Sequence, residues 1–152
     1  MSEYLDILFT DEIREKLGGV YSIYSGVSVS VITRGEYSIS VYFQCNTERT
    51  NELITAVRDY LADVIKNNVN ADMFNKAKEA LLKEHESSIQ RNLYIAQSYA
   101  NSSVLYSTPL SRLNRRPGVI RDVTPEDLQA ICRGIISGGP VQVVLYPENW
   151  ER

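Results

Sequence analysis

Two short segments that alternate apolar and polar residues constrain the fold of this chain most strongly. They span 27–31 and 37–43, with Arg34-Gly35-Glu36 between them. Alternation with a period of two is typical of β-strands, because successive side chains point to opposite faces. A three-residue loop places Val27 opposite Phe43 and keeps one face of the pair apolar, whereas a two-residue loop mixes apolar and polar residues on each face. The sequence therefore predicts an antiparallel hairpin with a three-residue loop, whose glycine supplies the unusual backbone dihedral.

Most of the remaining chain has the 3.6-residue periodicity of amphipathic helices, with caps and breakers that set their limits. The predicted elements are a helix over 3–17 that ends at Gly18-Gly19, a helix with Thr47 as N-cap that ends near Asn67, a long helix that Asn70 caps and that can run past Arg91, a helix over 94–106, a short helical turn over 111–115 between Pro109 and Pro117, a helix that begins at Thr124-Pro125, and a last strand over 141–146.

This element order, α-β-β-α-α-α-α-β, indicates an α+β fold with a mainly antiparallel sheet and helices packed on one face. A length of 152 residues corresponds to about one domain. We therefore expect a single domain over 1–152. Because three strands make a thin sheet and the first helix begins without a cap, we also expect this domain to be truncated at its N-terminus, as a piece of a longer protein.

The charge balance and hydropathy exclude several classes of protein. Sixteen Lys+Arg against nineteen Asp+Glu give a net charge of −3, so the chain lacks the basic excess of a nucleic-acid-binding protein. The strand over 37–43 carries no Lys or Arg among its aromatic residues, which argues against an RNA-binding sheet. No apolar run approaches the ~20 residues that span a bilayer. We expect neither a nucleic-acid partner nor membrane insertion.

The chain is poor in metal-ligating side chains. His85 is the only histidine, and Cys45 and Cys132 are the only cysteines. Because a catalytic zinc needs about three protein ligands, this chain alone is not expected to hold one. We expect the cysteines to be separate buried thiols. His85 lies four residues after Leu81, on the same helix face, and is expected to be a half-buried structural residue.

Five segments carry a resemblance that covers nearly the whole chain. They are 13–22 (IREKLGGVYS), 35–43 (GEYSISVYF), 76–82 (KAKEALL), 123–130 (VTPEDLQA) and 143–148 (VVLYPE). In this order they resemble the pitrilysin/insulinase family of zinc metallopeptidases, and the chain looks like the C-terminal, zinc-free half of a bacterial zinc protease. The resemblance implies a ferredoxin-like metallohydrolase half-domain.

The resemblance also implies a function for two residues. The zinc-free half of this family contributes an arginine and a tyrosine with the separation of Arg14 and Tyr21. They would contact the peptide substrate, or stabilise the oxyanion that forms on its carbonyl, in trans to the zinc of the other half. The family's inverted motif, His-x-x-Glu-His, is absent here, because Leu81 stands three residues before Glu84. No cofactor is therefore expected in this fragment.

Several further expectations follow from the resemblance alone. The partner would be a zinc-bearing N-terminal half, on the same chain or on a separate subunit, and the fragment alone would be inactive. A bacterial periplasmic or cell-envelope location is expected by analogy. The alternative is a catalytically inert scaffold or interaction domain of a family relative, against which the arginine–tyrosine pair argues, since a scaffold does not need it.

The position of Tyr21 conflicts with the predicted hairpin. Tyr21 has the same odd parity as Val27, which faces the core, so it should not face a substrate chamber. A β-bulge, for which Gly26 is the candidate, or a strand that starts after Tyr21 would resolve the conflict. The alternative is that the assignment of core-facing residues is wrong at the start of the strand. On the other face of the hairpin, Tyr42 and Ser40 either line a peptide-holding chamber or are covered by elements outside this chain.

Overall fold

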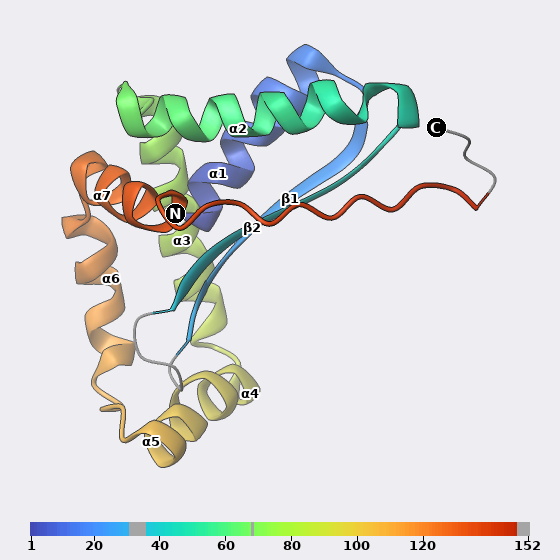
Figure 1. Ribbon diagram of the computed structural model, residues 1–152. Coiled ribbons are helices and arrows are strands. Elements are labelled where there is room, and N and C mark those ends of the chain that lie inside the picture. Colours follow the sequence, from blue (N-terminus) through green and yellow to red (C-terminus); the bar gives the residue numbers. More distant parts are fainter. Residues whose placement is uncertain (31–35, 68, 149–152) are drawn as a thin grey trace.

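A computed structural model describes residues 1–30, 36–67 and 69–148 of the chain (Figure 1). Two strands, β1 (Val20–Val29) and β2 (Tyr37–Cys45), form an antiparallel hairpin. The helical elements in chain order are α1 (Ser2–Phe9), its π-helical continuation η1 (Thr10–Leu17), the 3-10 turn η2 (Thr47–Arg49), α2 (Thr50–Lys66), α3 (Ala71–Ser88), α4 (Asn92–Ile95), the π-helical η3 (Ala96–Ala100), α5 (Asn101–Tyr106), α6 (Arg112–Asp122) and α7 (Pro125–Ile136). The predicted α+β class is confirmed.

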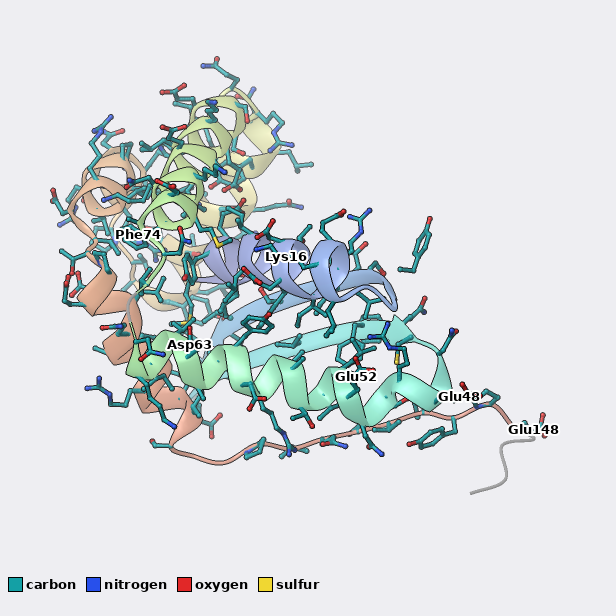
Figure 2. All side chains as sticks on the ribbon, turned by 90° about the horizontal axis from the view of Figure 1, so that it is seen from above. Lys16, Glu48, Glu52, Asp63, Phe74 and Glu148 are labelled. Carbon is teal, nitrogen blue, oxygen red and sulfur yellow. The ribbon has the colours of Figure 1, made fainter. Side chains whose placement is uncertain are left out.

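The helices cover one face of the hairpin. Odd-numbered side chains in the middle of both strands are buried or half-buried against the helical core, whereas Tyr24 and Tyr42 on the other face are 62% and 59% exposed. Figure 2, seen from above, shows η1 with Lys16 beside α2 with Glu52 and Asp63, and the hairpin next to both. The core is centred on fully buried side chains of α1, η1, α2 and α7, which are Leu5, Phe9, Ile13, Leu53 and Cys132.

The register of the hairpin differs from the predicted one by four residues. Val27 lies opposite Ile39 rather than Phe43, so the predicted three-residue loop is wrong. The apolar face is nevertheless the predicted one, because a shift by an even number of residues leaves every side chain on its own face. Gly35, which was expected to shape the loop, lies outside the described residues.

Two helix starts have the predicted side-chain caps. The side chain of Asn70 accepts a hydrogen bond from the Met73 N–H (3.0 Å) and begins α3. The hydroxyl of Thr124 accepts from the Asp127 N–H (3.2 Å), while the Asp127 carboxylate accepts from the Thr124 N–H (2.9 Å). This reciprocal capping box begins α7 and satisfies two backbone donors that a helix start otherwise leaves free.

Three other predicted helix limits are wrong. Thr47 is not an N-cap, because the 3-10 turn already begins there and leads into α2 at Thr50. The long helix α3 ends at Ser88 instead of running past Arg91, whose guanidinium folds back to donate to the Ser88 hydroxyl (2.8 Å). The short turn before Pro117 is part of α6, which continues through this proline even though proline removes one backbone hydrogen bond from a helix. None of the described helices is both long and apolar enough to span a bilayer.

The last predicted strand is extended but unpaired. Residues 141–148 run out from α7 along the outside of the molecule (Figure 1), and no strand pairs with them in the described part of the chain. Their odd-numbered apolar side chains are 77% to 93% exposed, while Gln142 accepts a hydrogen bond from Arg58 of α2 (2.8 Å). The alternation is that of a strand, but a strand also needs a neighbour.

Tyr4 joins α1 to the start of α3. Its side chain is only 2% exposed, and its phenol oxygen accepts a hydrogen bond from the Asn70 N–H (3.2 Å). Burial raises the pKa of Tyr4, because the phenolate would lose its hydration, and this outweighs the hydrogen bond from Asn70, which lowers the pKa.

We expect Tyr4 to make the fold sensitive to alkali. Since its pKa is higher in the folded than in the unfolded chain, the stabilisation by the neutral phenol is complete below the unfolded value of about 10 and is lost as the pH rises through the folded value. Urea unfolding between about pH 8 and 11 should show a falling free energy of unfolding that Tyr4→Phe makes less steep, at a cost of ~1 kcal/mol at neutral pH. The exposed Tyr37→Phe is the control; an equal slope in all three proteins would contradict the assignment.

Candidate functional site

Arg14 and Tyr21 lie on either side of a tight reversal at Gly18-Gly19. Both glycines have positive φ (69° and 88°), which residues with a Cβ rarely adopt. A Cβ on Gly19 would also collide with the guanidinium of Arg49, which donates to the backbone of η1 (3.4 Å) and pairs with Glu52 (2.6 Å). The reversal therefore brings η1, which carries Arg14, alongside β1, which carries Tyr21.

A polar stripe on α1 and η1 follows the outer edge of β1. Its members recur every four residues and are Ser2, Asp6, Thr10 and Arg14. The Asp6 carboxylate accepts hydrogen bonds from the N–H (2.6 Å) and hydroxyl (2.8 Å) of Ser25, and the Ser2 hydroxyl donates to the Ser25 carbonyl (2.9 Å). Four helical residues rise by ~6 Å, and two strand residues by ~6.7 Å. Ser2 and Asp6 share Ser25, and each step of the stripe beyond Asp6 advances about as far as one outward-facing position of the strand.

The π-helical turns of η1 keep this stripe aligned with the strand. Four α-helical residues turn about 40° beyond a full circle, so a stripe with this spacing drifts around a purely α-helical surface. The wider turns of η1 rotate less per residue and reverse that drift between Thr10 and Arg14. Sequence periodicity did not predict this change of helix type.

A cavity of about 270 Å³ opens where the stripe reaches Arg14. It is lined by three members of the stripe and by three consecutive strand residues, which are Asp6, Thr10, Arg14, Ser22, Ile23 and Tyr24. The lining thus combines the guanidinium of Arg14, residues with hydroxyl groups and the Asp6 carboxylate, which already accepts from Ser25. The guanidinium and the hydroxyls are donors that suit a carbonyl or an anionic oxygen. Tyr21 is not a lining residue, and within the described chain no hydrogen bond joins it to Arg14.

A β-bulge directs the side chain of Tyr21. Val20 lies opposite Cys45 and Ile23 opposite Phe43, so three steps along β1 match two along β2. Val20 and Ile23 are both buried, which turns the residues between them away from the core. Tyr21 is accordingly 87% exposed, the highest value of any tyrosine among the exposed large apolar side chains.

The bulge resolves the conflict of parity, although it does not lie at Gly26. The core-facing residue at the start of the strand is Val20 and not Tyr21, so the predicted alternative of a wrong core assignment there is confirmed. The bulge lies at Tyr21-Ser22, whereas Gly26 pairs regularly with Ser40. The strand also begins at Val20, before Tyr21 and not after it. Burial of Val20 determines the position of the bulge, and this burial could not be inferred from the alternation further along the strand.

Arg14 is less engaged than its neighbour Lys16. Lys16 contacts Glu12 (2.8 Å) and Asp11 (2.9 Å), and the hydrogen bonds of these two carboxylates raise its pKa. Arg14 contacts Glu15 at 3.6 Å, and its side chain is 51% exposed. Ion pairs between exposed groups contribute little, so the guanidinium of Arg14 can turn toward a ligand at small cost.

The metal-ligating side chains do not form a cluster. Among residues 1–30, 36–67 and 69–148, no group of three or more His, Cys, Asp or Glu could hold a metal ion. His85 is buried in α3 rather than half-buried, and its Nδ1 has no hydrogen-bond partner among the residues that the structure describes. Cys45 and Cys132 are separate free thiols. Cys132 is buried, which raises its pKa, whereas Cys45 is only half-buried, contrary to the prediction. The described side chains therefore offer no ligand set that fits a zinc ion.

The residues that surround Arg14 were not predicted from the sequence. Ser2, Asp6 and Thr10 are small polar residues on a helix and have no motif of their own. The only sequence signal for them is that they and Arg14 follow one another at intervals of four residues. It becomes informative only when the helix is known to lie along the edge of β1, where Tyr24 completes the lining.

The family of the chain follows from a match across this site. Residues 4–81, which are just over half of the chain, match the family model described as the peptidase M16 inactive domain. The chain belongs to the M16 peptidase family. The match contains Arg14, Tyr21 and the whole hairpin, and it confirms the resemblance to a C-terminal half-domain of the pitrilysin/insulinase peptidases.

A solved structure has the same fold over most of the chain. This M16 domain is similar to the periplasmic protease PqqL from Escherichia coli, with a TM-score of 0.64 and 20% sequence identity. The similarity covers 88% of this chain and 14% of the PqqL chain, so the domain spans about one seventh of that protease. No curated protein matches the chain.

We expect the tyrosines to differ in their reactivity toward nitration, because their rings differ in solvent exposure. Brief treatment of the folded domain with tetranitromethane should nitrate Tyr21 early, because its ring is 87% exposed, and should spare Tyr4 and Tyr99, which are buried. Peptide mass spectrometry locates the modified rings, with the domain unfolded in guanidinium as the control. Protection of Tyr21 comparable to that of Tyr4 would contradict the bulge.

Proposed function

We propose that this domain is the substrate-contacting, zinc-free part of a zinc metalloendopeptidase that hydrolyses peptides. Arg14 and Tyr21 would touch the substrate, or stabilise the oxyanion, while the other half of the enzyme holds the metal. The observation that carries the proposal is the backbone geometry around Gly18-Gly19. The chain reversal places Arg14 beside β1, and the β-bulge turns Tyr21 out of the core.

The chemistry of both side chains suits this role. A guanidinium donates several hydrogen bonds and keeps its positive charge, and a phenol donates one. Attack on a peptide carbonyl builds negative charge on its oxygen, and donors already held in place stabilise that charge without reorganising. Exposure of Tyr21 and weak pairing of Arg14 leave both groups able to reach a substrate.

Zinc would belong to the partner half and not to this domain. Bound there, it would polarise the scissile carbonyl and activate a water molecule. The residues of this domain would only bind and orient the peptide, because its described side chains include no suitable ligand cluster. The partner half is the N-terminal part of the same polypeptide or a separate subunit.

We also propose a periplasmic location. The similar structure, PqqL, is described as a periplasmic protease, and an analogous setting would give the domain access to unfolded peptides outside the cytoplasm. A catalytically inert scaffold is the second candidate. Its support is the description of the matching family model as an inactive domain.

Substitution of the two residues in the assembled peptidase distinguishes these candidates. Arg14→Ala and Tyr21→Phe should each lower kcat by ~10²–10³, because each removes one donor to the developing charge. Cleavage of a quenched fluorescent peptide measures the rate, and circular dichroism confirms folding. Arg121→Ala and Tyr37→Phe are matched controls, since both residues are exposed and lie outside the cavity beside Arg14.

Unchanged cleavage by correctly folded Arg14→Ala and Tyr21→Phe enzymes would favour the scaffold. The domain purified alone should bind no stoichiometric zinc and cleave no peptide. Zinc-dependent turnover by the domain alone would overturn the division between the two halves.

A further inference from the structure

The positive charge of the chain is concentrated in one segment that has no acidic residue. Residues 87–121 contain none of the nineteen Asp and Glu residues, although the whole chain has a net charge of −3. The basic residues of this segment are all arginines, and they are Arg91, Arg112, Arg115, Arg116 and Arg121. Such an asymmetry of charge within one chain indicates a surface that meets an anionic partner.

The middle of the same segment exposes apolar side chains. Residues 92–111 carry no charge and include α4, η3 and α5, which form the lower end of the molecule in Figure 1, opposite α2. Five large side chains here are 46% to 84% exposed, and they are Leu93, Val104, Leu105, Tyr106 and Leu110. Clustered exposed apolar side chains mark sites that bind a partner or a membrane.

A tight turn joins this apolar segment to the arginines of α6. Helix α5 ends at Ser107, which has a positive φ of 53°, and the Thr108 N–H donates to the Ser102 carbonyl (3.4 Å). The Arg112 N–H donates to the Pro109 carbonyl (3.0 Å), so the chain enters α6 directly after the turn. We call this region the α5–α6 corner and define it by its exposed side chains, which are Val104, Leu105, Leu110, Arg112 and Arg115.

The arginines of the corner have no acidic partner. Arg112 begins α6, whose first turn contains no acidic residue, and Arg115 donates only to the Ser111 hydroxyl (3.1 Å). Within the described ranges no carboxylate pairs with either arginine, whereas Arg116 pairs with Glu84 (3.3 Å). The start of a helix carries partial positive charge, which adds to that of the arginines and favours an anion.

We propose that the α5–α6 corner binds the surface of an anionic lipid bilayer. Arg112 and Arg115 donate to the phosphate groups of the lipids, since a guanidinium suits the geometry of phosphate. Val104, Leu105 and Leu110 enter the boundary between headgroups and acyl chains, where their burial adds to the electrostatic attraction. This contact lies at the surface of the bilayer, and none of the described helices needs to cross it.

The combination of side chains favours a lipid surface over other polyanions. Nucleic acids offer phosphates together with bases that stack on aromatic rings, and valine and leucine do not stack. An anionic bilayer offers negative charge and an apolar layer within one short depth, which is the pattern that the corner presents. An acidic protein is the remaining partner, and the experiment below distinguishes it.

Sedimentation of the 152-residue chain with sucrose-loaded vesicles tests the proposal. The chain should bind vesicles made of equal amounts of phosphatidylglycerol and phosphatidylcholine, and it should not bind vesicles of phosphatidylcholine alone. Binding should weaken as NaCl rises from about 0.05 to 0.5 M, because salt screens the attraction between surface charges.

Substitution of the two arginines tests the electrostatic part. Arg112→Gln combined with Arg115→Gln should weaken binding by ~30-fold, which is about fivefold for each arginine near an anionic surface. The matched control combines Arg58→Gln with Arg133→Gln, which removes the same charge from exposed positions outside the corner and should leave binding unchanged.

Substitution of the aliphatic residues tests the apolar part. Val104→Ser combined with Leu105→Ser should weaken binding by at least ~10-fold, because less apolar surface is then buried in the lipid. The control combines Val141→Ser with Leu145→Ser, which changes equally exposed side chains of the C-terminal segment and should have no effect. Circular dichroism confirms that each variant is folded.

Three outcomes would overturn the proposal. They are no binding to the anionic vesicles, equal binding to the neutral vesicles, and equal losses in the corner variants and their controls. Soluble polyglutamate that binds as tightly as the vesicles, with no effect of the serine substitutions, would also overturn it and favour an acidic protein. None of these readouts depends on zinc or turnover, so they are independent of the proposed peptidase function.

Discussion

The hydrogen bonds from α1 to the backbone of Ser25 are the interaction on which the rest of this domain depends. They fix the first helix against the outer edge of β1, because Ser2 and Asp6 together occupy both backbone groups of one strand residue. The spacing of the helix then matches that of the strand. As a consequence Arg14 arrives beside Ser22–Tyr24, and a cavity remains between them.

Two local irregularities of the backbone place Arg14 and Tyr21 in the candidate site. The π-helical turns of η1 keep Arg14 in line with the edge, and the bulge after Val20 turns Tyr21 to the exposed side. Both features cost regular backbone hydrogen bonding, and both kinds are frequent near functional sites. The positive-φ turn at Gly18-Gly19 joins them within a few residues.

Local chemistry could be predicted from the sequence, whereas partners in space could not. Caps such as Asn70 and Thr124 act through neighbours three residues away, and they are confirmed. The alternation of Val and Ser correctly predicted which side chains face the core. A period of two, however, allows the strands to shift by any even number of residues, and the predicted register differs from the observed one by four residues. The bulge was misplaced at Gly26 because burial of Val20 depends on tertiary packing. Arg14 and Tyr21 came from a family resemblance; their roles remain predictions.

The central claim is that this domain supplies a cation and a phenol to a peptide whose cleavage depends on metal held elsewhere. The most direct measurement is a structure of the assembled peptidase with an uncleavable peptide. The account predicts that the guanidinium of Arg14 and the phenol of Tyr21 both lie within hydrogen-bond reach of carbonyl oxygens of that peptide, about 2.7–3.2 Å away. A peptide bound in the assembly with both side chains turned away from it would contradict the account.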